Sequence, residues 1–534
     1  MVPESLWRSI STWLAAAKAR SILGALLVAL TALQGCATLP AEVRKEPSAA
    51  VPNDGATRLQ KLARASIPDA ALSGFRLEPL AAYAFETRLV LADRAERALD
   101  VQYYILHDDD TGKNLLLALR DAASRGVRVR LLLDDLYTTG EDELFSGLAA
   151  FANVEVRLFD PFPAARSSTA MRFLAALADL SRLDHRMHNK LFVADNAFAV
   201  AGGRNIADEY FMRSPAVNCV DLDVLAAGPV VAELSSQFDA YWNSSFAYPL
   251  DSIVPRTDSP EQMRARFDAL TGGVTRPLTD TGVPERLQRY AHTPADIAHG
   301  GALSMTEAVA HVYTDPVDKI AGVKLENRDG TVRDEVAQAM RLAREEVFVV
   351  SPYFIPGERG LQAMRDLRAR GVRLRVLTNS LAATDEPLIH TGYSRYRVPM
   401  LEAGVEIYEL SPGLSRKRNR LGRFGQSFGG LHAKVSIIDY SRIFVGSMNL
   451  DVRSERRNTE LGILIDSPDF AEEFVNTMDF RSSVYRLRLA ADRHDIEWIT
   501  GDDETTVLHD DPETTAWLRW KVRLLAPLVP ESEL

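Results

Sequence analysis

The chain has 534 residues, of which 46% are hydrophobic and 25% are charged, so it has enough apolar content for two or more domains with buried cores. Its formal net charge of -11 argues against binding to nucleic acid or to anionic membranes through bulk positive charge. The sequence contains only two cysteines, Cys36 and Cys219, so we expect neither an intramolecular disulfide nor a metal site built on cysteine.

Residues 1–35 have the pattern of a bacterial lipoprotein signal peptide. A basic stretch precedes the apolar run 22–33, which is too short for an ordinary membrane-spanning helix. The segment ends in Leu33-Gln34-Gly35-Cys36, which resembles a lipoprotein cleavage box with Cys36 as the acylated residue. An uncleaved signal anchor is the alternative, and either interpretation puts the rest of the chain outside the cytoplasm, facing the periplasm. Ala37 after the cysteine favours the outer membrane over the inner membrane.

The next stretches predict a tether followed by alternating helices and strands. Residues 36–75 are rich in alanine, proline and charge, and we expect them to link the anchor to the first folded domain. A helical pattern covers residues 80–99, and "LDVQYYIL" (99–106) predicts a strand. Residues 108–135 then predict a loop, an amphipathic helix, a turn at Gly126 and a second strand. This βαβ order indicates an α/β fold with mixed, largely parallel sheets.

The same order of elements recurs later in the chain. Residues 345–380 repeat strand, loop, helix and strand, and Arg125-Gly126-Val127 recurs as Arg370-Gly371-Val372. The repeat therefore covers whole domains. We expect two tandem α/β domains, related by a pseudo-twofold axis and joined by a connector; their ranges are 76–245 for the first, 246–335 for the connector or insertion, and 336–534 for the second with a C-terminal extension.

Each repeat contains one copy of a short polar motif. The Lys, Asp and Asn follow the His at +2, +7 and +17 in both copies, which are His188, Lys190, Asp195 and Asn205, then His432, Lys434, Asp439 and Asn449. Residues two apart on a strand share a face, so the imidazole and the ammonium should project together from a β-hairpin. An imidazole, a fixed positive charge and an amide donor suit a phosphate ester. A single copy would be equally consistent with an ordinary hairpin.

These paired motifs resemble those of the phospholipase D superfamily. The stretches "LLLDDLYTTGEDEL", "YFIPG" and "LTNSLAATDEPLIHTGYSRYR" are similar to its bacterial cardiolipin synthase branch of the C type. The resemblance implies that one histidine attacks the phosphorus of a phosphodiester, giving a covalent phosphatidyl-histidine, while the other acts as acid and then base. It favours His188 as the nucleophile and His432 as the acid and base, and the pseudo-symmetry permits the reverse.

The resemblance also assigns roles to the other residues of the motifs. Lysines and asparagines at these positions hold the phosphate oxygens, while a carboxylate about thirty residues after each histidine orients its ring. The predicted catalytic set is therefore His188, Lys190, Asp195, His432, Lys434 and Asp439, with Asn205 and Asn449 for phosphate, and Asp221 and Glu460 following His188 and His432 as orienting groups. The two motif aspartates lie at turns, so we expect them to brace the hairpins. This mechanism needs no metal and no organic cofactor.

The expected function is transfer of a phosphatidyl group from phosphatidylglycerol or phosphatidylethanolamine to phosphatidylglycerol, which yields cardiolipin. The partners are then phospholipids and a membrane, not nucleic acid, and a monomer suffices because one chain supplies both motifs. A hydrolase of phospholipase D type that releases phosphatidic acid is the first alternative, with a nuclease less favoured. A catalytically inactive lipid-binding protein is the second alternative, and two intact motifs argue against it.

Overall fold

The structure is a computed structural model. It describes residues 39–40, 43–175, 180–256, 258–275, 283, 285–321, 330–414, 428–478, 480, 483–493, 495–500 and 506–530. The expected signal peptide and Cys36 lie outside these residues. In the part of the chain that is described, no helix is both long enough and apolar enough to cross a membrane.

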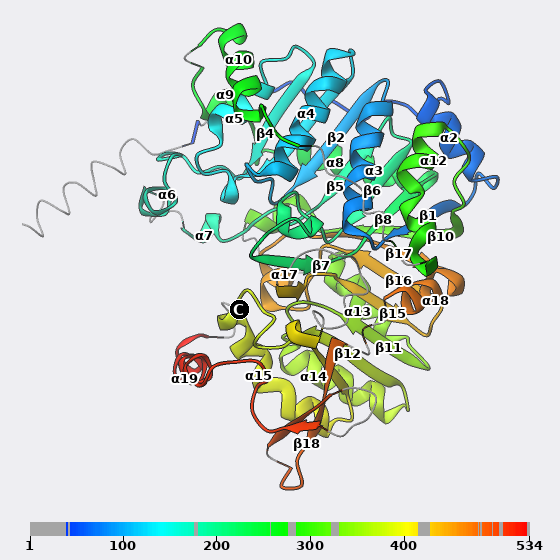
Figure 1. The fold of residues 1–534 in the computed structure, drawn as a ribbon, viewed down its shortest axis with the longest axis vertical. Helices are drawn as coiled ribbons and strands as arrows, with labels where there is room; N and C mark the ends of the chain where they lie inside the picture. The colour runs from blue at the N-terminus through cyan, green and yellow to red at the C-terminus, as the bar shows by residue number, and fades with distance from the viewer. Residues whose placement is uncertain are drawn as a thin grey trace, which may run out of the picture.

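Two α/β halves are stacked along the long axis of the molecule (Figure 1). The sheet of the first half is built from β1 (Ser73–Glu78), β2 (Ala98–Tyr103), β3 (Arg128–Asp134), β4 (Val154–Phe159), β5 (Leu191–Ala194), β6 (Phe198–Gly202), β8 (Asp223–Ala227) and β9 (Ala247–Pro249). Their hydrogen-bonding order is β1-β8-β6-β5-β2-β3-β4-β9, in which the pairs β2–β3 and β3–β4 are parallel and the others antiparallel.

The second half repeats this pattern. Its strands are β11 (Glu346–Val350), β12 (Arg373–Asn379), β13 (Glu406–Leu410), β15 (Val435–Ile438), β16 (Arg442–Gly446), β17 (Leu461–Asp466), β18 (Val484–Leu489), β19 (Ile496–Thr500) and β20 (Thr506–Leu508). They pair in the order β17-β16-β15-β11-β12-β13-β18-β19-β20, and β11, β12 and β13 are parallel. The expected α/β fold of two repeats is confirmed. The expectation that the sheets are largely parallel is wrong, because the parallel pairs are confined to three strands in each half and the other pairs of both sheets are antiparallel.

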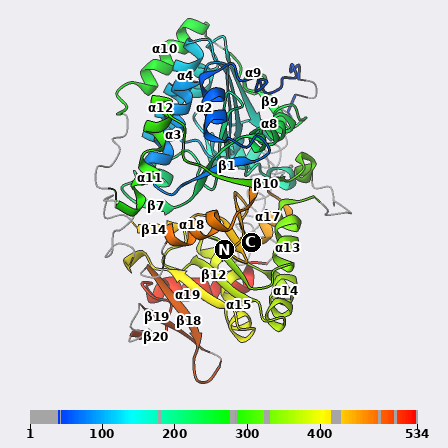
Figure 2. The ribbon, with the colours of Figure 1, turned by 90° about the vertical axis from the view of Figure 1, so that its right-hand side faces the viewer.

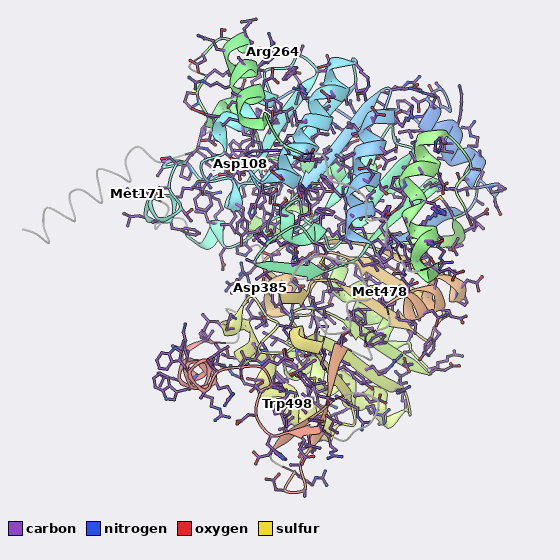
Figure 3. All side chains as sticks on the ribbon, in the orientation of Figure 1. Asp108, Met171, Arg264, Asp385, Met478 and Trp498 are labelled. Carbon is purple, nitrogen blue, oxygen red and sulfur yellow. The ribbon has the colours of Figure 1, made fainter. Side chains whose placement is uncertain are left out.

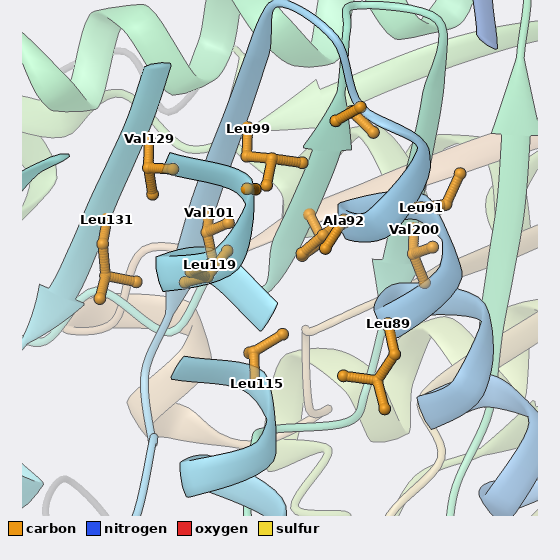
Figure 4. Packing of buried hydrophobic residues seen from close by; sticks show 14 of the residues in the cluster. Leu89, Leu91, Ala92, Leu99, Val101, Leu115, Leu119, Val129, Leu131 and Val200 are labelled. Carbon is orange, nitrogen blue, oxygen red and sulfur yellow. The ribbon is translucent and has the colours of Figure 1, made fainter. Parts of the chain in front are cut away.

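Helices cover the outer faces of both sheets and lie between the halves. The outer helices include α3 (Ala81–Arg94), α4 (Asp110–Ser124) and α12 (Thr293–His299) in the first half, and α13 (Val332–Arg341), α14 (Gly357–Ala369) and α15 (Pro387–Glu402) in the second. Figure 4 shows leucines of α3 and α4 packed on β2 and β3. A separate apolar cluster contains residues of both halves, including Phe238 of α8 (Pro229–Trp242) and Phe474 of α18 (Pro468–Thr477). This shared core fixes one half against the other.

Residues that favour helix ends lie at the termini of α4 and after α14. Asp109 caps α4 by accepting a hydrogen bond from the N–H of Gly112. Gly126 and Gly371, which follow α4 and α14, have φ angles of 98° and 85°, a conformation that favours glycine. The next strand begins directly after each glycine, so the turn sets the direction of the βαβ unit.

The prediction of a tether over residues 36–75 is wrong for most of its described part. Arg58–Ser66 forms helix α2, which begins at a capping box between Thr57 and Gln60. Leu59 and Leu62 of this helix are buried in the core of the first half. Upstream, the N–H of Ala50 donates to the Asp239 carboxylate over 2.8 Å. The apolar face of α2 favours packing over extension, which composition alone did not indicate.

The stretch expected to be a connector contributes a strand to the contact between the halves. Strand β10 (Thr306–Thr314) pairs with β1 through residues 306–308 and with β17 through residues 309–314, both antiparallel. It therefore joins the two sheets edge to edge (Figure 2). A segment rich in proline and glycine thus includes a structural element that holds the halves together.

Candidate active site

The motif hairpins form where they were predicted. Strands β5 and β6 are joined at Asp195 and Asn196, with φ angles of 53° and 49°, and strands β15 and β16 at Asp439 and Tyr440, with φ angles of 52° and 49°. Two successive positive φ values are typical of tight hairpin turns. His188 and Lys190 precede β5 instead of lying on it.

The aspartates of the motifs hold the hairpins and do not face the histidines. The Asp195 carboxylate accepts hydrogen bonds from the N–H groups of Glu96, Arg97 and Ala98. Asp439 does the same with three successive N–H groups that belong to Arg344, Glu345 and Glu346. The contacts are those expected for bracing residues, and the inclusion of both aspartates in the catalytic set finds no support in them.

The two histidines come together where the halves meet. The backbone N–H of His188 donates to the carbonyl of Thr459 over 2.9 Å, and that of His432 donates to the carbonyl of Val220 over 2.8 Å. Beside them, β7 (Val217–Val220) and β14 (Phe428–Leu431) form a two-stranded parallel sheet across the halves. The histidines retain small exposed fractions, 6% for His188 and 8% for His432. Each histidine is thus held by backbone of the opposite half.

Each imidazole contacts a carboxylate of the opposite half. His188 Nδ1 lies 2.9 Å from Glu460 Oε2, and His432 Nδ1 lies 2.6 Å from Asp221 Oδ2. The predicted carboxylates are therefore the ones present, but the expectation that each orients the histidine preceding it in its own half is wrong. The segments after each motif cross the contact between the halves, as in the bridge between Met187 and Thr459 next to Glu460.

The two carboxylates have different surroundings. Glu460 accepts hydrogen bonds from the hydroxyls of Ser447 and Ser454, and burial raises its pKa to about 7. Burial also tends to raise the pKa of Asp221, but the charge and hydrogen bond of His432 together with the Lys434 charge outweigh it and lower the pKa to about 2. Glu460 is therefore close to half protonated at neutral pH, whereas Asp221 is ionised.

The histidines and lysines are shifted towards their neutral forms. Burial, followed by the charges of Lys190 and Lys434, holds the pKa of His188 well below its ordinary value. Burial also lowers the pKa of His432, with Asp221 opposing the shift. Lys190 Nζ donates to the carbonyl of His188 over 2.6 Å, and burial lowers its pKa to about 7, while that of Lys434 falls to about 8. Burial thus favours the neutral form of His188, in which a ring nitrogen can act as a nucleophile, whereas Asp221 favours retention of a proton on His432.

The two motif asparagines differ in their bonding. Asn205 Oδ1 accepts the N–H of Ile105 over 3.2 Å, and its side chain also bonds to the Tyr210 hydroxyl. Asn449 Oδ1 is buried without a hydrogen-bond partner. The two asparagines therefore have the same offset from their histidines but differ in how their side chains are held.

Three tyrosines and one arginine at the site were not predicted. The ring of Tyr104 lies edge-on to His188 with centroids 4.9 Å apart, Tyr137 contacts Tyr104 in the same manner at 5.3 Å, and Tyr210 lies edge-on to His432 at 5.0 Å. The positive charge of Arg453 contributes to the lowered pKa of His188, and its Nε is buried without a hydrogen-bond partner. The matching position in the first repeat is a glutamate, so comparison of the repeats could not have identified this residue.

Among the described residues, one group has the composition of a metal site. His107, Asp109 and Glu209 bring possible ligand atoms within 4.8 Å of one another. Asp109 already caps α4 and also accepts the N–H of Asp208 over 2.7 Å. These bonds account for the position of its carboxylate without a cation.

Comparison with known proteins agrees with this geometry. The family described as "Cardiolipin synthase, PLD-like domain" matches residues 89–242 and 336–480, so each match contains one motif. The chain is 37% identical to cardiolipin synthase C of Escherichia coli (strain K12) over 459 residues, which cover 84% of this chain and 93% of that protein. It is 28% identical to cardiolipin synthase A of Pseudomonas fluorescens (strain Pf-5) over 398 residues, covering 74% and 65%.

A solved structure shares the fold of both halves. Phosphatidylserine synthase from Haemophilus influenzae aligns with a TM-score of 0.52 at 14% identity, covering 88% of this chain and 98% of the other. Fold and site together define an enzyme of the phospholipase D superfamily that transfers phosphatidyl groups. The chain belongs to the cardiolipin synthase family with phospholipase D-like domains.

Proposed function

We propose that this enzyme makes cardiolipin by moving a phosphatidyl group from phosphatidylglycerol or phosphatidylethanolamine to the hydroxyl of phosphatidylglycerol. The observation that carries the proposal is the reciprocal pairing of His188 with Glu460 and of His432 with Asp221. A carboxylate that accepts the Nδ1 proton leaves Nε2 free for a reacting group. The similarity to cardiolipin synthases C and A supports lipid substrates of this kind.

In the first step, Nε2 of His188 attacks the phosphorus of the donor lipid. The phosphorus–nitrogen bond forms as the bond to the leaving alcohol breaks, and protonated His432 gives its proton to the departing oxygen. Lys190, Lys434 and the two motif asparagines are suited to hold the phosphate oxygens and their developing negative charge. The negative phosphate also favours the charged form of both lysines, whose pKa values of about 7 and 8 lie close to neutrality.

In the second step, His432 takes a proton from the hydroxyl of the acceptor lipid. The resulting oxygen attacks the phosphorus, the bond to His188 breaks, and both histidines return to their starting states. The electrostatics support this division of roles. Nearby positive charges oppose protonation of His188, which is paired with a carboxyl of pKa about 7. His432 is paired with ionised Asp221, which favours protonation of its ring.

Product analysis tests the proposal directly. Purified protein is incubated with phosphatidylglycerol and phosphatidylethanolamine, separately and together, and the lipids are identified by mass. We expect cardiolipin, with ethanolamine released when phosphatidylethanolamine is the donor. Phosphatidic acid as the main product would instead identify a hydrolase, and no turnover would identify a lipid-binding protein. Isotopically labelled phosphatidylglycerol would show which lipid donates the phosphatidyl group.

We also propose that acylated Cys36 anchors the enzyme in the bacterial envelope, facing the periplasm and more favourably in the outer membrane. The cleavage box in the sequence supports this location, and the presence of both motifs in one chain supports a monomer. Incorporation of labelled fatty acid into the wild-type chain, but not into Cys36→Ser, is the expected result. Label that persists in the variant would contradict acylation at this residue.

A further inference from the structure

Exposed apolar side chains gather on two helices, one from each half. Helix α6 (Thr169–Ala175) exposes Met171, Phe173 and Leu174, and helix α19 (Ala516–Leu525) exposes Trp517, Trp520 and Leu524. The exposed fractions on α19 reach 67%, 52% and 54%, and its two indole rings are stacked 4.8 Å apart. Both helices project from the same side of the molecule (Figure 1), with Met171 at its edge in Figure 3.

Helix α6 is attached to a loop that reaches His188. The guanidinium of Arg172, buried within the protein, donates to the Asp135 carbonyl over 3.0 Å and to Thr139 Oγ1 over 2.9 Å. The same loop carries Tyr137, which contacts Tyr104 next to His188. The exposed face of α6 is therefore coupled to one side of the active site.

Helix α19 packs on α15 of the second half, and Arg395 of α15 donates to the carbonyl of Val529, just beyond α19, over 2.9 Å. Helix α15 begins at Pro387, two residues after Asp385, whose carboxylate accepts the hydroxyl proton of Tyr353 over 2.7 Å. The loop before α15 occupies the position in its repeat that the Tyr137 loop occupies in the first. The two apolar helices are therefore linked to equivalent loops of the two repeats, α6 directly through Arg172 and α19 through α15.

The charge of α19 contrasts with that of the whole chain. Its sequence, AWLRWKVRLL, has no acidic residue, and Lys521 and Arg523 are exposed, although the chain carries a net charge of -11. The acidic groups just before the helix are bonded within the protein: Asp510 to Arg519, Asp511 to Arg397, and Glu513 to Ser411 and Tyr485. The helix thus presents tryptophans and positive charges together, a combination typical of helices that lie in a membrane interface.

We propose that α6 and α19 dock on the surface of a phospholipid bilayer that contains anionic headgroups. Trp517, Trp520 and Leu524 would enter the interface, Lys521 and Arg523 would contact phosphates, and the apolar residues of α6 would form the second point of contact. Two contacts fix the orientation of the enzyme, so the site lies over the headgroups. The inference rests on the proposed function, in which both substrates are membrane lipids.

The tryptophans provide a direct test. Trp242 and Trp498 are buried, and Trp7 and Trp13 belong to the N-terminal segment and can be replaced by phenylalanine. In that background, the remaining exposed tryptophans, Trp517 and Trp520, report on α19. We expect their emission to shift to the blue and to be quenched by lipids brominated in the upper acyl chain, in vesicles of phosphatidylethanolamine and phosphatidylglycerol. Emission unchanged by these vesicles would overturn the proposal.

A charge variant and a matched control separate docking through α19 from a general effect of added negative charge. Lys521→Glu with Arg523→Glu should weaken the quenching and reduce turnover on vesicles roughly tenfold, while turnover on detergent-dispersed lipid stays the same. Arg341→Glu with Arg365→Glu, which reverses two exposed positive charges on α13 and α14, should change neither. Equal loss in both variants would contradict a specific docking face.

Two further outcomes separate the docking proposal from self-association and from the proposed transferase activity. A blue shift that depends on protein concentration and needs no vesicles would identify α19 as an interface between two copies of the chain, which would overturn membrane docking. Quenching by vesicles without formation of any lipid product would support docking while refuting the proposed transferase. The two proposals can therefore fail separately.

Discussion

The two half-sites of this enzyme share a motif and differ in the carboxyl group that each histidine meets. On one side, His188 meets Glu460, which two serine hydroxyls hold and which burial leaves with a pKa of about 7. On the other side, His432 meets Asp221, which remains ionised with a pKa of about 2. One histidine thus lies beside a carboxyl that is about half protonated at pH 7, and the other lies beside an ionised carboxylate. This difference favours different protonation states of the two rings.

One small residue contributes to the difference between the two carboxyl environments. Gly203, at the position of Ser447, has no side chain because a Cβ there would lie 2.1 Å from Asp221 Oδ1. The charge of Arg453 acts on His188, whereas the matching residue of the first repeat, Glu209, precedes Tyr210, which contacts His432. These differences support the proposed division of roles between the two rings.

The largest expected effect comes from the histidines. His188→Ala should lower turnover by ~10⁴-fold or more, because it removes the proposed nucleophile. His432→Ala should be equally slow with natural lipids. With a donor whose leaving group needs no proton, such as a nitrophenyl phosphatidyl ester, it should still accumulate an adduct, which peptide mass analysis would assign to His188. An adduct on His432 in the His188→Ala protein would reverse the assignment.

The carboxylates should differ in the size of their effects. Asp221→Asn removes a full negative charge beside His432, and we expect a loss of ~10²-fold in kcat because the acid step weakens. Glu460→Gln removes a carboxyl that is about half neutral at pH 7, so a loss of roughly tenfold is expected. Equal losses at pH 7 would show that the two half-sites are electrostatically equivalent.

The dependence of activity on pH tests the same difference between the two half-sites. Glu460 becomes charged as the pH rises through about 7, so kcat/KM should rise there, while Lys434 loses its charge above about 8, so kcat/KM should fall. Initial rates at lipid concentrations well below saturation measure both limbs in the free enzyme. Glu460→Gln should remove the rising limb and leave the falling limb in place. A rising limb that persists in this variant would assign it to another group.

Arg453 is expected to affect kcat/KM, although the first repeat has a glutamate at the matching position. Arg453→Gln removes a cation without a hydrogen-bonded partner at Nε and should lower kcat/KM roughly tenfold, with partial recovery in Arg453→Lys. Glu209→Gln, at the matching position, serves as the control and should have a smaller effect. If both variants behave alike, the asymmetry around the two histidines has no role in substrate binding.

The smallest effect on turnover is expected at the motif aspartates. Asp195→Ala leaves three backbone N–H groups without their acceptor in a buried turn and should destabilise the fold by about 2–3 kcal/mol. Asp439→Ala, at a half-buried turn, should cost about 1 kcal/mol. Denaturant unfolding measures both, and kcat of the folded fraction should change less than threefold. A large loss of kcat in a stable variant would make these aspartates participants in the chemistry.

Much of this protein could be predicted from local patterns in the sequence. The strand–helix–strand units, the two hairpins with their turns at Asp195 and Asp439, and the pairs of His and Lys all depend on residues close together in the chain, where spacing determines which side chains share a face. The two orienting carboxylates were identified through the family resemblance, which implies one about thirty residues after each histidine, and each lies in an apolar run where an unpaired charge would be unfavourable.

Tertiary structure alone decided which carboxylate serves which histidine. Offsets along the chain predicted partners within a half, but Asp221 and Glu460 cross to the opposite half at the edges where the two sheets meet. The joining of the sheets by β10, the burial of α2 and the position of Arg453 likewise depend on packing between distant segments. Local sequence sets which groups are available, whereas the burial and charge that fix their proton states arise only when the halves come together.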